Sequence, residues 1–263
     1  MPVIFVFAIG VIIIASLNMA FQPVEETLNY YRTKLLQHRL ERLGEAMINR
    51  YEENPASGFI TPANLPTTAG YEYLRLDSPQ DFQAQSAPTV SDSVWRFTRM
   101  AVWFESPYNA VGNAAYVSAA ENTCGTGSFA TATSWCGRSN SIWMKVETRE
   151  SHSTILLGEK QRLVRTIAKF GRRYAKDQTF TPLAVGTART MPQLVGYAGT
   201  AAACSGVYSY NDIPFTCDDL FNMWGIPISF NQVTANHIAL VNRTQITNSS
   251  GALVRLAEEM KLE

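Results

Sequence analysis

The chain has no net charge, no histidine cluster and no Cys-x-x-Cys motif. Its 22 lysines and arginines balance 22 aspartates and glutamates, whereas a nucleic-acid-binding surface needs an excess of positive charge. Hydrophobic residues make up 46% of the chain, which is too many for a disordered protein. The histidines His38, His152 and His237 are scattered, and none has zinc-ligand spacing from a cysteine. The sequence therefore predicts a folded protein with no metal, no cofactor and no nucleic-acid partner.

Charged side chains are also absent from residues 2–21. A helix of this length, at about 1.5 Å per residue, reaches roughly the 30 Å of a bilayer core. A cleavable secretory signal begins with lysine or arginine and ends in a small-x-small site. Here neither residue precedes the apolar run, and residues 17–22 read Leu-Asn-Met-Ala-Phe-Gln, which is no such site. We therefore predict an uncleaved transmembrane segment at residues 1–23. A cleaved signal and a buried core helix are the alternatives.

The four cysteines fall into two local pairs. Four cysteines allow three pairings, and the short separations favour Cys124 with Cys136 and Cys204 with Cys217. Each bridge would close a loop of small or turn-forming residues and contribute about 3 kcal/mol through loop entropy. Reduced thiols and a metal site are the alternatives. Disulfides form in oxidising compartments, which favours a periplasmic location for the body of the chain.

The charges that flank the apolar segment favour the opposite topology. Lysine and arginine mark the cytoplasmic side of a membrane span, and here Arg32, Lys34, Arg39 and Arg42 follow the segment while none precedes it. We follow the cysteines, because an N-terminal tail of one or two residues crosses the membrane or stays behind at little cost.

After Pro23 the sequence becomes amphipathic. Apolar residues recur at steps of three and four from Leu28 through Tyr31 and Leu35 to Tyr51, with charged residues between them. This spacing predicts a helix over residues 24–53 that continues the apolar segment. Proline removes one backbone donor, so a kink is expected at Pro23.

Part of the chain resembles another part of it. The stretch RLERLGEAMINRYEENPASGFITPANL, at residues 39–65, has a counterpart in RLVRTIAKFGRRYAKDQTFTPLAVG, at residues 162–186. The matches at a constant offset of 123 include Arg39 with Arg162, Arg42 with Arg165, and Tyr51 with Tyr174. We predict a tandem duplication with units at residues 24–150 and 151–263. Chance similarity between two amphipathic helices is the alternative.

Each unit is predicted to contain a helix followed by short strands, which makes the fold α+β, with one helix on one antiparallel sheet, twice over. The expected strands lie at residues 71–76, 93–104, 114–118, 141–148, 194–197, 226–230 and 237–241. A further helix is expected at residues 251–261.

This arrangement resembles the type IV pilins, pseudopilins and minor pilins. The resemblance rests on an apolar N-terminal helix with a proline near residue 22, here Pro23, on its amphipathic continuation, and on a small helix-on-sheet head with disulfides. The run LLQHRLERLGEAMINRYEENPASGFITPANL looks especially like PilM-type proteins of conjugative thin-pilus systems. The resemblance implies a single-pass protein of the bacterial inner membrane, with its bulk in the periplasm or in an extracellular pilus. It implies pilus subunits, inner-membrane pilus assembly proteins and the lipid bilayer as partners.

The sequence departs from the pilin pattern at its N-terminus. Pilins carry a short basic leader and a glutamate at the fifth mature position, whereas this sequence shows no leader and has Phe5. The prediction is therefore a non-catalytic role in pilus assembly, initiation, tip or base, not as the major subunit. The predicted assembly helix includes Phe5, Pro23, Leu28, Tyr31 and Leu35. The alternatives are a bitopic periplasmic adaptor of a secretion or conjugation channel, and a membrane-anchored periplasmic binding protein or hydrolase.

Catalytic motifs are weak in this sequence. Ser151 and His152 are adjacent, but no acid is placed to complete a triad, so we interpret Ser151–Ser153 as a structural loop. Asp218 and Asp219 are expected to cap a short helix, with calcium binding as the alternative. The basic residues Lys169, Arg172, Arg173 and Lys176 are interpreted as a solvated helix face. No residue is predicted to be catalytic.

Overall fold

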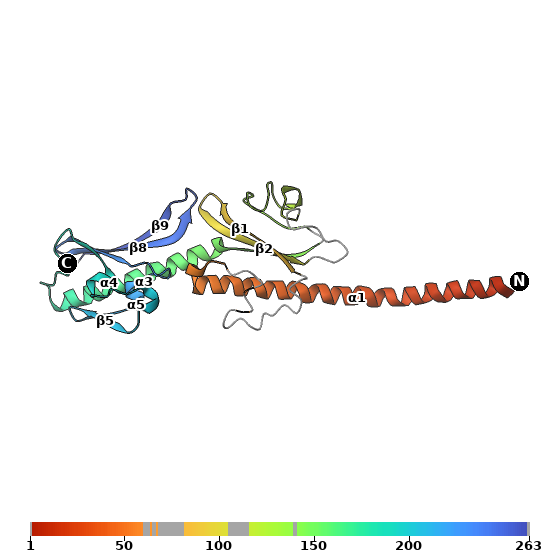
Figure 1. Ribbon diagram of the computed structural model, residues 1–263, viewed down its shortest axis with the longest axis horizontal. Coiled ribbons are helices and arrows are strands. Elements are labelled where there is room, and N and C mark those ends of the chain that lie inside the picture. The colour runs from red at the N-terminus through yellow and green to blue at the C-terminus, as the bar shows by residue number, and fades with distance from the viewer. Residues whose placement is uncertain are drawn as a thin grey trace.

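The computed structural model describes residues 2–59, 64, 67, 82–104, 116–138 and 141–261. The side chains of residues 2–23, 25, 26 and 82 lie outside this description. Two long helices dominate the molecule, α1 (Pro2–Glu53) and α3 (Thr148–Lys176), and Figure 1 shows α1 projecting far beyond the rest of the chain.

The remaining elements are short helices and the strands of two sheets. The short helices are η1 (Pro55–Ser57), η4 (Ala119–Glu121), α4 (Met191–Leu194), η5 (Ala201–Ala203) and α5 (Cys217–Leu220). The strands are β1 (Phe82–Ser91), β2 (Trp95–Phe104), β3 (Ile142–Glu147), β4 (Ala188–Thr190), β5 (Val207–Tyr210), β6 (Ile213–Thr216), β7 (Ser229–Thr234), β8 (His237–Asn248) and β9 (Leu253–Lys261).

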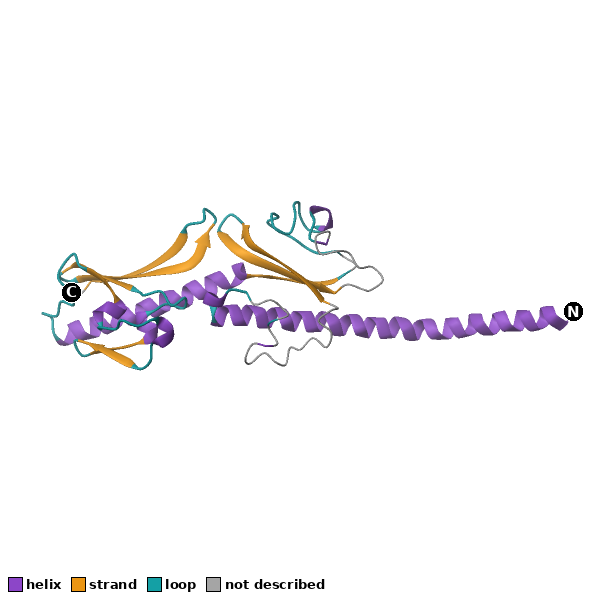
Figure 2. Cartoon of the chain, in the orientation of Figure 1, coloured by secondary structure: helices purple, strands orange, loops and turns teal. Residues whose placement is uncertain are grey.

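The described strands form a seven-stranded antiparallel sheet and the small β5–β6 hairpin. The large sheet has the order β1-β2-β8-β7-β4, while β3 pairs with β2 and β9 pairs with β8. Strands β2 and β8 pair at only two positions, Trp95 with Asn248 and Arg96 with Thr247. Figure 2 shows the consequence, which is two arched groups of strands that meet at a narrow join above the helices.

Each group of strands packs on one long helix. Leu40, Leu43 and Met47 of α1 share a core with β2 and β3. Leu163 and Phe170 of α3 share a larger core with β7 and β8. Burying these apolar faces is the main source of stability for both layers.

The buried helix positions correspond between the layers. At the offset of 123, Leu40, Leu43 and Met47 correspond to Leu163, Thr166 and Phe170, and all six side chains are buried. The same helix positions are therefore buried in both layers, although Thr166 donates to Asp219 of α5 at 2.8 Å. The duplication and its boundary stay a prediction. Because α3 begins at Thr148, the boundary expected just before the second helix, between residues 150 and 151, lies inside the first turn of α3.

The predicted transmembrane segment at residues 1–23 is wrong. Within the described residues, the structure contains no helix with the length and apolar character needed to cross a bilayer. Residues 27–53 of α1 offer no span either, because charged residues such as Arg32, Lys34 and Glu41 recur there every turn or two, and charges inside a bilayer are costly. The single-pass location in the bacterial inner membrane, and the membrane-anchored forms of the predicted roles, are wrong for the same reason.

The α+β class is confirmed, whereas the expected pair of separate sheets is wrong, because the β2–β8 pairs join both layers into one sheet. The predicted helix at residues 251–261 is also wrong. Residues 253–261 form strand β9, which pairs with β8 from Lys261 back to Leu253. Pairing with a neighbouring strand outweighs the helix propensity of Leu, Ala, Glu and Met here.

The other strand predictions had mixed outcomes. The strands at residues 93–104 and 141–148 are confirmed by β2 and β3, and the strand at residues 237–241 is the first half of β8. The strand expected at residues 226–230 begins only at Ser229. The strand expected at residues 194–197 is wrong, because Leu194 ends helix α4 and residues 195–197 belong to no strand. Residues 71–76 lie outside the described residues, and the described residues 116–118 are not a strand.

Candidate functional site

Helix α1 carries an apolar stripe over residues 24–35. The side chains of Val24, Leu28, Tyr31 and Leu35 are 52%, 63%, 66% and 54% exposed. Their spacing of four, three and four residues places them on one face of the helix, as in a coiled-coil seam. Exposed apolar side chains that lie together mark a surface for another molecule.

The stripe is distinct from the face that α1 packs against the sheet. At about 100° per residue, the stripe is turned roughly 120° around the helix axis from Leu40, Leu43 and Met47. Those three side chains are buried, so the packing of the head accounts for one face of α1 only. The stripe is therefore exposed and can contact another molecule.

Basic side chains flank the stripe. The Cζ atom of Arg32 lies 5.8 Å from the ring centroid of Phe104, at the end of β2. The Nζ atom of Lys34 lies 5.8 Å from the ring centroid of Tyr30. These cation–π contacts hold two positive charges close to the apolar seam.

The predicted assembly residues are only partly described. Leu28, Tyr31 and Leu35 lie on the exposed stripe, whereas the side chains of Phe5 and Pro23 lie outside the described residues. Helix α1 is continuous through Pro23.

Both predicted disulfides are confirmed. Cys124 is bonded to Cys136 and Cys204 to Cys217, with Cα–Cα distances of 5.4 and 5.8 Å. The first bridge lies in the segment of residues 116–138, which covers the outer face of β1 and β2 with aromatic side chains. The second ties the segment before β5 to the start of α5.

A buried arginine attaches the first disulfide segment to the sheet. Arg99 of β2 is fully buried, and its Nε lies 2.7 Å from Glu147 Oε1 on β3. Its Nη1 donates to the carbonyl oxygens of Phe129 and Ala132, both at 2.8 Å. The sequence pattern gave no signal for this pair, since its two members are 48 residues apart.

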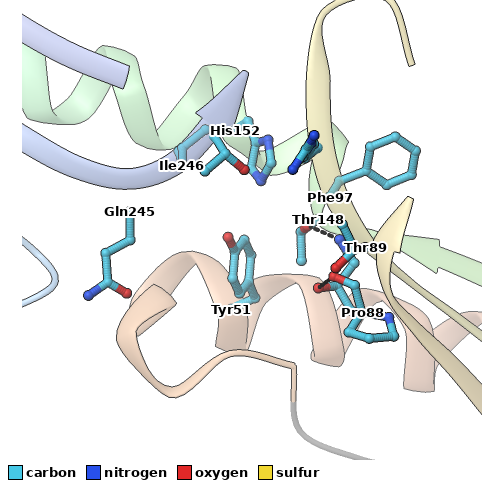
Figure 3. Close-up of a pocket in the computed structure, with 11 residues that line it drawn as sticks. Tyr51, Pro88, Thr89, Phe97, Thr148, His152, Gln245 and Ile246 are labelled. Carbon is cyan, nitrogen blue, oxygen red and sulfur yellow. Dashed lines mark hydrogen bonds between the residues drawn. The ribbon is translucent and has the colours of Figure 1, made fainter. Parts of the chain in front are cut away.

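A small cavity of about 210 Å³ lies where the two layers meet. Figure 3 shows the hydroxyl of Tyr51, from the end of α1, pointing toward His152 of α3 between β2 and β8. The backbone nitrogen of Thr98 donates to Thr148 Oγ1 at 3.0 Å across this cavity. Polar side chains from both long helices therefore line the join between the layers.

His152 is the most perturbed titratable group of this join. Its side chain is 3% exposed, and its Nδ1 has no hydrogen-bond partner among the described residues. Burial lowers the pKa of His152 to about 4, and the negative charge of Asp92 only partly opposes this shift. The ring of Trp95 lies 5.6 Å away, edge-on. The imidazole is therefore neutral at pH 7 and acts as part of the core.

The structure assigns structural roles to the other motifs. Ser151 and His152 lie in the first turns of α3, so the predicted loop is wrong. The predicted cap is wrong in position, because Thr216 is the N-cap of α5 and Asp219 lies inside this helix, where its side chain completes a capping box with Thr216. Asp219 Oδ2 also lies 2.6 Å from Lys169 Nζ, and Arg173 Nε donates to the carbonyl oxygen of Asn211 at 3.2 Å. Two of the four basic residues of α3 are thus paired, Lys169 with α5 and Arg173 with the turn of the β5–β6 hairpin.

A buried polar network below β8 was not predicted. Glu159 of α3 and Asn242 of β8 are fully buried, and Asn242 Nδ2 donates to the Glu159 carboxylate. Asn222 Nδ2 donates to Asn242 Oδ1 at 2.7 Å and joins the loop after α5 to the same network. Burial raises the pKa of Glu159, against the opposing effects of Arg162 and Asn242.

No protein-family model, no curated protein and no solved structure matches this chain. The resemblance to type IV pilins stays a prediction that rests on the sequence features given above. Functional assignment therefore depends on the surfaces of the molecule itself, of which the stripe on α1 is the most distinctive.

Proposed function

We propose that this chain is a non-catalytic, pilin-like component of a type IV or conjugative pilus, or of its assembly machinery. It acts by packing the α1 stripe against a helix of a neighbouring protein. The observation that carries the proposal is a 52-residue helix in which Leu40, Leu43 and Met47 pack on a sheet while Val24, Leu28, Tyr31 and Leu35, nearer its N-terminus, stay exposed. The sequence resemblance to pilins supports the same role.

The energetics of the stripe suit helix-to-helix packing. Each aliphatic side chain of the stripe is about half exposed, so its burial contributes roughly 1 kcal/mol. The sum over the stripe is small compared with the cost of association. A stable contact therefore needs more of α1 than residues 24–35, as expected when long helices pack side by side.

The charges beside the stripe favour a different protein as the partner over a second copy. In a coiled-coil register with Leu28 and Leu35 in the seam, Lys34 and Arg39 occupy flanking positions. An in-register parallel pair of copies places Lys34 of one helix beside Arg39 of the other, and like charges repel. The partner helix that fits has an apolar seam with acidic flanks. This agrees with a minor or assembly component better than with a self-assembling major subunit.

Photo-crosslinking in the native host tests the proposal. A photoreactive phenylalanine analogue replaces Leu28 or Tyr31 in the full chain, and the matched control places it at Gln37, which is exposed on another face of α1. We expect crosslinks to helix-bearing pilus or assembly proteins from positions 28 and 31 and much weaker crosslinks from position 37.

Three results would contradict this proposal in different ways. Equal crosslinking from all three positions removes the stripe as the docking face. Crosslinks only between copies of the chain contradict the acidic partner helix. Crosslinks only to proteins of a secretion channel favour the adaptor role.

A further inference from the structure

The outer face of the C-terminal strands differs from that of the N-terminal strands. The segment of residues 116–138 covers β1 and β2 with a dense aromatic core. On β7, β8 and β9, Figures 1 and 2 show α3 on one side of the strands. The opposite side contains a cavity of about 410 Å³ lined by β4, β7, β8 and β9.

Small residues create this cavity. The register places Ala257, Val241, Ser229 and Thr190 side by side across the four strands. Ala239 and Asn231 form part of the next row. Because paired residues of antiparallel strands project from the same face, this row of mostly short side chains leaves the face hollow.

Three arginines line the hollow, Arg189 of β4 and a neighbouring pair on β8 and β9. Arg243 of β8 and Arg255 of β9 are directly paired in the register, and both line the cavity. Directly opposed like charges destabilise an antiparallel pair. Both side chains are exposed, and among the described residues no ion pair involves either of them. The acid nearest along β9 on this face, Glu259, pairs with His237 at 3.2 Å instead.

We propose that this cavity binds a phosphate group of a phosphate monoester, with Arg243 and Arg255 as its charged ligands. Two guanidinium groups match the charge of a phosphate dianion, and their planar donors suit its oxygens. The hydroxyl groups of Ser229 and Thr190 and the amide of Asn231 line the same cavity and supply neutral donors. A phosphate alone is smaller than 410 Å³, so the remaining space takes the organic part of the ligand. The site lies on β-strands and does not depend on the α1 stripe.

The test measures binding of three probes to the full chain by isothermal titration calorimetry. The probes are inorganic phosphate, glycerol 3-phosphate, and vesicles with and without phosphatidic acid. We expect glycerol 3-phosphate to bind at least tenfold more tightly than inorganic phosphate. Tight binding to phosphatidic acid vesicles but not to glycerol 3-phosphate identifies a lipid headgroup as the source, and the reverse identifies a soluble metabolite.

Variants separate this site from general charge attraction. Arg243→Gln and Arg255→Gln should each weaken binding at least tenfold, whereas Arg165→Gln, on the exposed face of α3, should leave it unchanged. Arg255→Glu should abolish binding and also raise the melting temperature, because it converts a repulsive pair into an attractive one. Equal binding by all variants, or no binding of any probe by the wild-type chain, would overturn the proposal. A melting curve for each variant shows that it is folded.

Discussion

Replacing Arg99 by methionine should destabilise the N-terminal layer more than any surface change. Methionine keeps much of the length of the side chain but none of its donors. The carbonyl oxygens of Phe129 and Ala132 then lose their donor from Nη1, and that of Thr133 loses its 3.1 Å contact with Nη2. Glu147 loses its direct partner but keeps Lys145, whose Nζ lies 3.2 Å from Glu147 Oε1.

The magnitude follows from these losses. Breaking a buried ion pair by removing one member costs about 3–5 kcal/mol, and each unpaired buried acceptor costs about 1–3 kcal/mol. Because Lys145 still pairs with the carboxylate and water can reach some of the carbonyls, we expect a loss of roughly 3–4 kcal/mol. This is a large share of the stability of a typical domain.

Urea unfolding of the full chain, followed by tryptophan fluorescence, measures this loss. Trp103 and Trp135 are fully buried in the core that Arg99 helps to close, so their emission reports on it directly. Arg165→Met, on the exposed face of α3, is the matched control and should change stability by less than about 0.5 kcal/mol. A loss below about 1 kcal/mol for Arg99→Met would show that the disulfide segment is held mainly by its aromatic core.

Two further predictions concern the buried polar groups of α3. Because burial lowers the pKa of His152 to about 4 from 6.5, the unfolded chain binds a proton that the folded chain does not. The stability that the neutral His152 contributes is therefore fully present above pH 6.5. It falls by up to about 3 kcal/mol as the pH is lowered toward 4. His152→Gln should remove that part of the pH dependence, and parallel stability curves of both proteins between pH 4 and 7 would refute it. Asn242→Ala removes the side-chain amide that donates to the buried Glu159 carboxylate, and should lower the free energy of unfolding in urea by about 2–3 kcal/mol. The control Asn231→Ala, on the outer face of the sheet, should cost less, and equal losses of stability would refute the role of the network.

The sequence was informative where structure is local. The helix spacing over residues 24–53 and the short cysteine separations depend on neighbours along the chain, and both predictions are confirmed. Strand β1 was missed because Gln, Ser and Pro give little strand signal. It forms an edge strand with a register shift between Ala87 and Val90, beside Pro88, and an edge position tolerates proline.

The sequence was uninformative where structure depends on register. Arg99 with Glu147, and Arg243 with Arg255, are pairs only because specific residues of two strands stand opposite each other. A shift of one residue moves each side chain to the other face of the sheet. No spacing rule within a single segment could have brought these side chains together, so the polar core and the arginine pair emerged only from the fold.

The join between the layers makes the two proposed surfaces parts of one body. Tyr51 at the end of α1 shares a core with Ile155 of α3 and Ile246 of β8. A residue of α1 therefore contacts the same strand that presents Arg243. Two residue pairs link β2 to β8, and packed side chains make the other contacts of this join. A force applied to α1 by a bound partner helix is therefore transmitted through these contacts. Crosslinking at Leu28 should then be unchanged in Arg255→Gln, since the stripe and the arginine pair lie on separate elements of the chain.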